Sequence, residues 1–290
     1  MARPLRIEYA GAVYHVTSRG NAGNPIFDDD KDRIMLLNIL GKVNDRYHWL
    51  CHAYCLMVNH YHFVLETPDG NLSKGMRQLN GIYTMRFNKR HQRAGHVFQG
   101  RYRAILIQKE SHFLEVCRYV LLNPVRANMI KTPEGWRWSS YRGTVRKERP
   151  HPCLTVDWIL GQFRTRKREA ERKFKEFVYD GIGGEPIWKE VKNQSLLGGP
   201  DFVDQLVEYL RGHEEIKEIP KSQRYMNRPS MGEIFKEAKD VKKKRNVRIA
   251  DAIVRWGYSQ REIADYLRLH YSTVSRLLNE AGTDISKVKT

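Results

Sequence analysis

The chain has 290 residues with 51 Lys or Arg against 33 Asp or Glu, which gives a formal net charge of +18 at pH 7. This excess favours a polyanionic partner, either a nucleic acid or an anionic membrane surface. No segment approaches the roughly 18 apolar residues that a membrane span requires, and the first residues, MARPLRIEYAG, lack the apolar core of a signal peptide. We therefore expect a cytoplasmic, nucleic-acid-binding protein with no membrane association.

The four cysteines, at positions 51, 55, 117 and 153, contain no C-x-x-C pair, which argues against zinc-ribbon and dithiol redox sites. Cys51 and Cys55 lie in a strand-like run and are expected to be buried thiols, as suits a reducing compartment.

The N-terminal part alternates strand and helix patterns. Strands are predicted at 12–19, 49–58, 59–67 and 95–108, and helices at 29–47, 71–90 and 110–122. This β-α-β-β-α-β order predicts an α+β, ferredoxin-like (RRM-like) antiparallel sheet with helices on one face. The other face would then be free for a ligand.

The strand at 59–67 contains His60 and His62, which share one face because side chains alternate along a strand, while Tyr61 and Phe63 point the other way. Two neutral imidazoles side by side are two-thirds of a divalent-metal site. The alternative is that the two histidines bind no metal and are either exposed or buried in the core with hydrogen-bond partners. Glu66, further along the same face, is a possible acidic ligand, but we expect a salt-bridge residue.

The helix at 110–122 carries the second half of the candidate site. Tyr119 and Asn123 are four residues apart and so share a face, and the helix is expected to end near Asn123-Pro124 because proline disfavours the α region before it. Taken singly, Tyr119 is explained by core packing and Asn123 by a helix cap. Together with the histidines they offer a phenol nucleophile and a third, oxygen metal ligand.

Residues 71 to 109 contain nine Lys or Arg and no acidic residue, with Tyr83, Phe87, Phe98 and Tyr102 interleaved. A charge run is usually a solvated face, but this one spans helix, loop and strand, which is typical of a single-strand-binding groove with stacking aromatics. The expected nucleic-acid-binding residues of the N-terminal part are Arg19, Lys74, Arg77, Arg86, Lys89, Arg90, Arg93, Arg101, Arg103 and Arg126.

The C-terminal half is helical and charge-rich. Helices are predicted at 164–179 and 202–211, and a linker at 217–229. Ser259 and Glu262 form a capping box before an apolar helix, and a further helix begins near Tyr271, which indicates a helix-turn-helix for duplex DNA. Ser272, Thr273, Ser275 and Arg276 would contact that DNA; a small helical bundle for protein contacts is the alternative. The expected domains are 1–145, a helical connecting region at 146–244, and 245–290.

The N-terminal region resembles the REP-associated tyrosine transposases, which belong to the HUH single-strand transposases of the insertion-sequence-200 type. The segments that carry the resemblance lie within residues 3 to 142: RPLRIEYAGAVYHVTSRGN, HAYCLMVNHYHFVLETPDGNLSKGMRQLNG, GHVFQGRYRAILI, RYVLLNPVRAN and WSSY. Two positions depart from the family pattern, Val58 in place of proline and Leu121 in place of a polar residue.

The resemblance implies an HUH nuclease domain in which Tyr119 cuts single-stranded hairpin DNA through a 5′-phosphotyrosine, with Mg²⁺ or Mn²⁺ held by His60, His62 and Asn123. The protein would be bacterial and nucleoid-associated, as a monomer or a homodimer. Three other hypotheses remain: a regulator that binds repeat DNA without cutting, a replication or conjugation initiator, and an RNA-binding module. The lack of an RNP-type aromatic run argues against the last.

Overall fold

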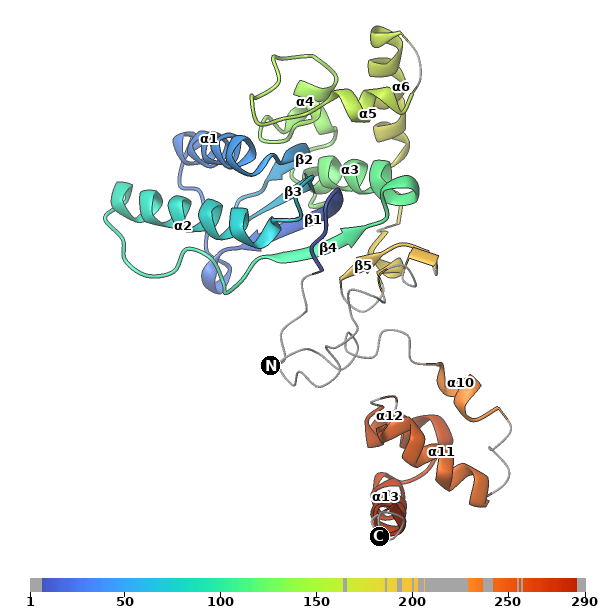
Figure 1. Cartoon of the computed structure of the whole chain (residues 1–290). Helices are drawn as coiled ribbons and strands as arrows, with labels where there is room; N and C mark the ends of the chain where they lie inside the picture. Colours follow the sequence, from blue (N-terminus) through green and yellow to red (C-terminus); the bar gives the residue numbers. More distant parts are fainter. Residues whose placement is uncertain are drawn as a thin grey trace. The chain divides into compact units, whose positions relative to one another are not determined.

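The computed structural model describes residues 7–163, 166–185, 187–191, 195–199, 201–202, 206, 229–236, 242–254, 256 and 258–285 (Figure 1). The chain divides into two compact units, Arg6–Phe202 and a second unit made mainly of Val203–Thr290. The boundary therefore falls after Phe202, and residues 146–202 lie in the same unit as the sheet.

A five-stranded sheet organises the first unit. Its strands are β1 (Ala12–Arg19), β2 (Leu50–Leu56), β3 (His60–Thr67), β4 (Arg103–Ile107) and β5 (Leu196–Leu197), in the order β2-β3-β1-β4-β5. The first four pair antiparallel, as expected, but β5 is parallel to β4, so the sheet is mixed.

The strand expected at 95–108 is shorter than predicted. Only Arg103–Ile107 is regular strand, and Gly95 and Gly100 adopt φ of 94° and 66°, a left-handed conformation that interrupts an extended chain.

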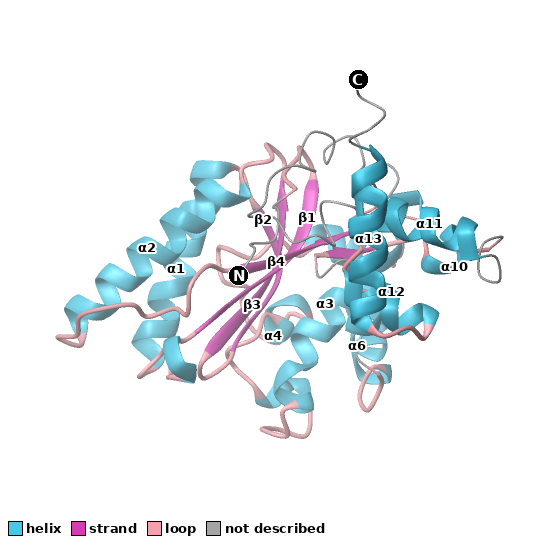
Figure 2. Ribbon diagram, turned by 90° about the horizontal axis from the view of Figure 1, so that it is seen from below, coloured by secondary structure: helices cyan, strands magenta, loops and turns pink. Residues whose placement is uncertain are grey.

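Helices cover both faces of the sheet rather than one. The helices α1 (Asp30–Tyr47) and α2 (Leu72–Arg90) lie on one side and α3 (Lys109–Arg126) lies on the other (Figure 2). Tyr61 is fully buried on the α2 side, where its hydroxyl donates to Asn80 Oδ1 at 2.6 Å. Val64 is fully buried in the α3 core. Because both sets of β3 side chains are buried, the histidine face is a covered interior and not an open platform.

The helix α3 continues past Pro124, against the expectation that it ends before it. Proline lacks the N–H that would bond the carbonyl of Val120. The side-chain amide of Asn123 donates to that carbonyl at 3.4 Å and to the carbonyl of Tyr119 at 3.0 Å. Asn123 thus replaces the missing donor, which lets the helix run on to Arg126.

The segment after α3 packs back onto it. It contains η2 (Pro133–Gly135), α4 (Tyr141–Thr144), α5 (Asp157–Gly161), α6 (Lys167–Asp180) and η3 (Ile187–Glu190); a further short turn, η1 (Asn21–Gly23), follows β1. Ile159, Phe174 and Val178 are fully buried in the same core as Phe113 and Val120 of α3. The helix predicted at 164–179 corresponds to α6. The helix predicted at 202–211 and the linker predicted at 217–229 fall almost wholly outside the described residues.

The second unit contains α10 (Met231–Ile234), α11 (Lys242–Val254), α12 (Gln260–Leu267) and α13 (Tyr271–Ile285). Its core includes Ile249, Ile263, Ala264 and Val274. The predicted capping box at the start of α12 is confirmed, since Ser259 Oγ accepts from the Glu262 N–H at 3.1 Å and Glu262 Oε2 accepts from the Ser259 N–H at 2.7 Å. Across the described residues, no helix is long and apolar enough to span a membrane.

Candidate active site

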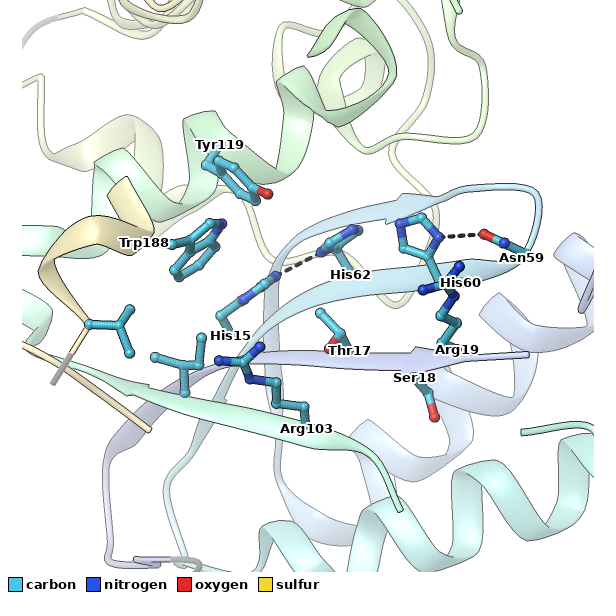
Figure 3. Close-up of a pocket in the computed structure, with 12 residues that line it drawn as sticks. His15, Thr17, Ser18, Arg19, Asn59, His60, His62, Arg103, Tyr119 and Trp188 are labelled. Atoms are coloured by element: carbon cyan, nitrogen blue, oxygen red, sulfur yellow. Dashed lines mark hydrogen bonds between the residues drawn. The ribbon is translucent and has the colours of Figure 1, made fainter. Parts of the chain in front are cut away.

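A pocket of about 490 Å³ opens on the α3 face of the sheet (Figure 3). The strands β1, β3 and β4 form its floor, and α3 and η3 contribute its other wall. Its lining residues are His15, Thr17, Ser18, Arg19, Asn59, His60, His62, Arg103, Ile105, Tyr119, Trp188 and Val191.

His60 and His62 lie side by side as predicted, with ring centroids 4.9 Å apart. In both rings Nδ1 is occupied: that of His60 lies 2.7 Å from Asn59 Oδ1, and that of His62 lies 2.9 Å from Nε2 of His15. The Nε2 of His62 is buried and has no hydrogen-bond partner within the described part of the chain. Both imidazoles therefore have their Nε2 left for another ligand.

The three pocket histidines are neutral. Burial, with smaller contributions from His15 and His60, holds the pKa of His62 well below its ordinary value. Burial and the charge of Arg103 lower the pKa of His15 to about 3, and burial and Arg19 lower the pKa of His60. Neutral imidazole is the form that binds a metal ion. The donor chemistry, including the unpartnered Nε2 of His62, fits a divalent cation.

Asn123 does not line this pocket, and its amide nitrogen bonds the carbonyls of its own helix. Its assignment as the third metal ligand stays a prediction. Glu66, the other possible ligand on this strand, instead pairs with Lys109 at 2.6 Å and with His52 at 2.9 Å, as expected for a salt-bridge residue.

A separate group of potential metal ligands, Asp28, Asp32 and His91, lies near the start of α1 and the end of α2. Arg90 forms an ion pair with the fully buried carboxylate of Asp32, and His91 Nε2 lies 2.9 Å from the same group. The buried charge is thus already balanced by a guanidinium, and none of these residues lines the pocket.

Tyr119 reaches into the pocket from α3, and its side chain points toward the histidines (Figure 3). Its ring centroid lies 6.3 Å from that of His62 and 6.2 Å from that of His15. The guanidinium carbon of Arg126 lies 5.4 Å from the ring centroid. The fold therefore joins the candidate nucleophile and the two candidate metal ligands in one site.

Among the pocket residues that were not anticipated, His15 and Trp188 contact the candidate site most directly. His15 lies edge to edge with His62, with centroids 5.1 Å apart and planes 9° apart, and Trp188 stacks on His15 at 4.7 Å. The sequence could have indicated His15, because His15, Thr17 and Arg19 occupy alternate positions of a predicted strand and therefore share one face. The sequence could not have indicated Trp188, since nothing in its local sequence points to a place in this pocket.

The predicted DNA-binding residues divide into four groups. Arg19 and Arg103 line the pocket, and Lys74, Arg77, Arg86, Lys89, Arg93 and Arg101 are exposed, the first four of them on α2. Arg90 is engaged with Asp29 and Asp32, and Arg126 donates to the Gly184 carbonyl. In α13, Ser272 and Arg276 are exposed and Thr273 and Ser275 are half-buried.

The aromatic residues expected as stacking platforms do not take that place. Tyr83 and Phe87 are fully buried, and Phe98 and Tyr102 are 6% and 8% exposed. Tyr83 and Phe87 are inside because they lie on the buried side of α2, and Phe98 packs against Tyr61 and Tyr83.

Comparisons with known proteins find similarity in the N-terminal part of the chain. Residues 9–122 match the family model described as "Transposase IS200 like". A curated relative, the "Putative REP-associated tyrosine transposase" of Haemophilus influenzae, is 23% identical over 137 residues, which cover 41% of this chain and 78% of that protein.

Solved structures also align with this chain, two among them over more than half of its length. One is described as the structure of a REP-associated tyrosine transposase bound to a REP hairpin, with 19% identity and a TM-score of 0.45, covering 55% of this chain and 91% of the other. The second is tRNA(His) guanylyltransferase from Saccharomyces cerevisiae, at 10% identity and a TM-score of 0.32, covering 65% and 85%. On the family match, and in line with the curated relative, the N-terminal part of this chain is similar to the IS200-like transposases.

Proposed function

We propose that the protein is a metal-dependent, site-specific single-stranded DNA endonuclease and strand transferase with Tyr119 as its nucleophile. The observation that carries this proposal is that Tyr119 lines one pocket with His60 and His62, with its ring centroid 6.3 Å from that of His62. Metal-assisted phosphoryl transfer to a protein side chain requires a nucleophile, here the tyrosine hydroxyl, and ligands for the metal ion, here the paired neutral imidazoles.

His60 and His62 would hold Mg²⁺ or Mn²⁺ through their Nε2 atoms, with Asn123 as the predicted third ligand. When bound, the ion would supply Lewis-acid polarisation of the scissile phosphate. Arg19 and Arg103, at the edges of the same pocket, add positive charge where the DNA backbone would enter.

In the cleavage step, Tyr119 Oη forms a bond to phosphorus while the bond between phosphorus and the 3′-oxygen breaks. The phenol loses one proton and the departing 3′-oxygen gains one, so that a 5′-phosphotyrosine and a free 3′-hydroxyl result. Attack of another 3′-hydroxyl on the phosphotyrosine reverses the chemistry and joins a new strand. The covalent link conserves the energy of the phosphodiester, so no nucleotide cofactor is needed.

The substrate we propose is a single-stranded hairpin of the repetitive extragenic palindrome type. The exposed basic residues of α2 would track its backbone, and α13 of a helix-turn-helix would contact duplex DNA through Ser272, Thr273, Ser275 and Arg276. The protein would work in the cytoplasm at the nucleoid, as a monomer or a homodimer. The alternative is a regulator that binds the hairpin without cutting it.

Incubation of labelled hairpin oligonucleotides with Mg²⁺ or Mn²⁺, followed by a denaturing gel, tests the proposal. The wild type should form a covalent protein–DNA adduct, and Tyr119→Phe should bind the hairpin without forming one. Tyr271→Phe, which changes an exposed tyrosine in α13, is the matched control and should retain the adduct. Tight binding with no adduct from the wild type under either metal would favour the regulator.

A further inference from the structure

A hydrogen bond links the candidate metal ligand His62 to a histidine of the neighbouring strand. The rings of His15 on β1 and His62 on β3 lie edge to edge with planes 9° apart, and Nε2 of His15 lies 2.9 Å from Nδ1 of His62. Both residues are buried, at 4% and 7% exposed. The outer nitrogens, Nδ1 of His15 and Nε2 of His62, have no partner among the described residues.

A bond between two neutral imidazoles has two possible proton arrangements. In one, His62 donates from Nδ1 and its Nε2 keeps a lone pair. In the other, His15 donates from Nε2, so that the proton of His62 sits on Nε2. Only the first arrangement leaves His62 able to bind a metal ion through Nε2, because a protonated ring nitrogen has no lone pair to give.

We propose that His15 is a positioning residue that accepts the Nδ1 proton of His62 and so holds the tautomer whose Nε2 is presented to the metal. This inference rests on the proposed function, since it assumes that His62 is a ligand. Asn59 does the same for His60, because its Oδ1 lies 2.7 Å from His60 Nδ1 and can only accept. Each candidate ligand would thus be oriented through its Nδ1, His62 by His15 of β1 and His60 by Asn59 of the turn before β3.

The surroundings of His15 fix its ring for this role. Trp188 stacks on its face at 4.7 Å, and Tyr119 meets it edge-on at 6.2 Å. The imidazole of His15 is therefore held by the indole of Trp188 on its face and by the hydrogen bond to His62 at its edge. An acceptor fixed in this way costs less entropy on metal binding than one that must first become ordered.

The test compares two substitutions in the full chain. His15→Phe keeps an aromatic ring between Trp188 and His62 but offers no acceptor, whereas the amide oxygen of His15→Gln can stand near the former Nε2. Mn²⁺ affinity is measured by electron paramagnetic resonance of the free ion. Loss of an outer acceptor should weaken Mn²⁺ binding roughly 10- to 100-fold in His15→Phe, with most of the affinity recovered in His15→Gln.

The matched control is His52→Gln, which alters another buried histidine of the sheet, hydrogen-bonded to Glu66 and outside the pocket. It should leave Mn²⁺ affinity unchanged even where it lowers the melting temperature. Wild-type Mn²⁺ affinity in His15→Phe, or equal losses in the Phe and Gln variants, would overturn the role of His15 and leave the proposed function standing. An absence of Mn²⁺ binding in the wild type would instead remove the metal-dependent function itself.

A second readout needs no change at His15. In the Mg²⁺-saturated wild type, nitrogen NMR of labelled histidine should show His62 protonated on Nδ1, with its signals assigned by their loss in His62→Gln. Protonation of His62 on Nε2 in that state would overturn the inference, whatever the cleavage assay gives.

Discussion

The indole of Trp188 meets the phenol ring of Tyr119 edge to face, with centroids 4.6 Å apart and planes at 82°. Trp188 belongs to η3, in a segment whose function the sequence did not reveal, and Tyr119 belongs to α3. The contact makes Trp188 part of the candidate active site, where it and Val191 line the pocket.

Trp188→Ala should slow adduct formation on a saturating hairpin. An edge-to-face aromatic pair contributes about 0.5–1.5 kcal/mol, so loss of the wall that holds Tyr119 should lower the rate roughly 2- to 10-fold. Trp188→Phe preserves a ring at this position and should lose less. A faster reaction in Trp188→Ala would show instead that the indole obstructs the pocket.

Removal of divalent metal with EDTA should abolish the adduct and preserve hairpin binding, because in the proposed function Arg19 and Arg103 would hold the DNA backbone independently of the ion. His60→Ala and His62→Ala should behave like the EDTA-treated wild type and should not recover when Mn²⁺ is restored. His48→Ala changes an exposed histidine that pairs with Asp69 and should cleave normally. Cleavage by the wild type in EDTA would contradict the metal requirement.

Truncation separates the two units. A protein of residues 1–202 should fold, bind Mn²⁺ and cut the hairpin, with altered affinity or target choice, because the sheet and the pocket lie within Arg6–Phe202. A protein of residues 1–145 should fail to fold stably. It loses Ile159, Phe174 and Val178 from the α3 core, and deletion of each such large side chain costs about 2–5 kcal/mol, against a total stability of about 5–15 kcal/mol. Circular dichroism and thermal melts of both fragments measure this difference.

The Glu66 carboxylate should make a pH-dependent contribution to stability. Burial opposes its ionisation, but hydrogen bonds from His52 and Lys109 outweigh burial and hold the pKa of Glu66 below its ordinary value. A depressed carboxyl pKa stabilises the fold above the unfolded-state value of about 4.3, and this contribution is lost as the pH falls through the folded-state pKa.

Glu66→Gln should therefore lower the free energy of unfolding by about 1.5–3 kcal/mol near pH 7, the range for a hydrogen-bonded charged group. Its deficit relative to the wild type should shrink as the pH is lowered below 4.3. Urea melts across this range provide the measurement, with Glu110→Gln, at an exposed site, as the control. A deficit that stays constant with pH would show that the carboxylate charge contributes nothing.

Local pattern was sufficient for much of the fold. Alternation along 12–19 and 59–67, and apolar spacing in the helices, gave β1, β3, α1 and α2 within a few residues. The pairing of His60 with His62 follows from strand geometry alone, because side chains two apart share a face. The shared helix face of Tyr119 and Asn123 was likewise predictable from their spacing. These features depend only on neighbours in the chain.

Most of what the sequence left open depends on contacts between distant segments. The end of α3 is a local exception, because the rule for residues before proline does not include the amide of Asn123, which supplies the missing donor. Both faces of the sheet are covered because α3 lies on the face opposite α1 and α2. The helices α5 and α6 then pack on α3, and no local signal specifies that return. The position of η3 brings Trp188 onto His15, and the pairing of β1 with β3 joins His15 to His62. The chemistry of the site therefore depends on non-local contacts that periodicity and spacing do not encode.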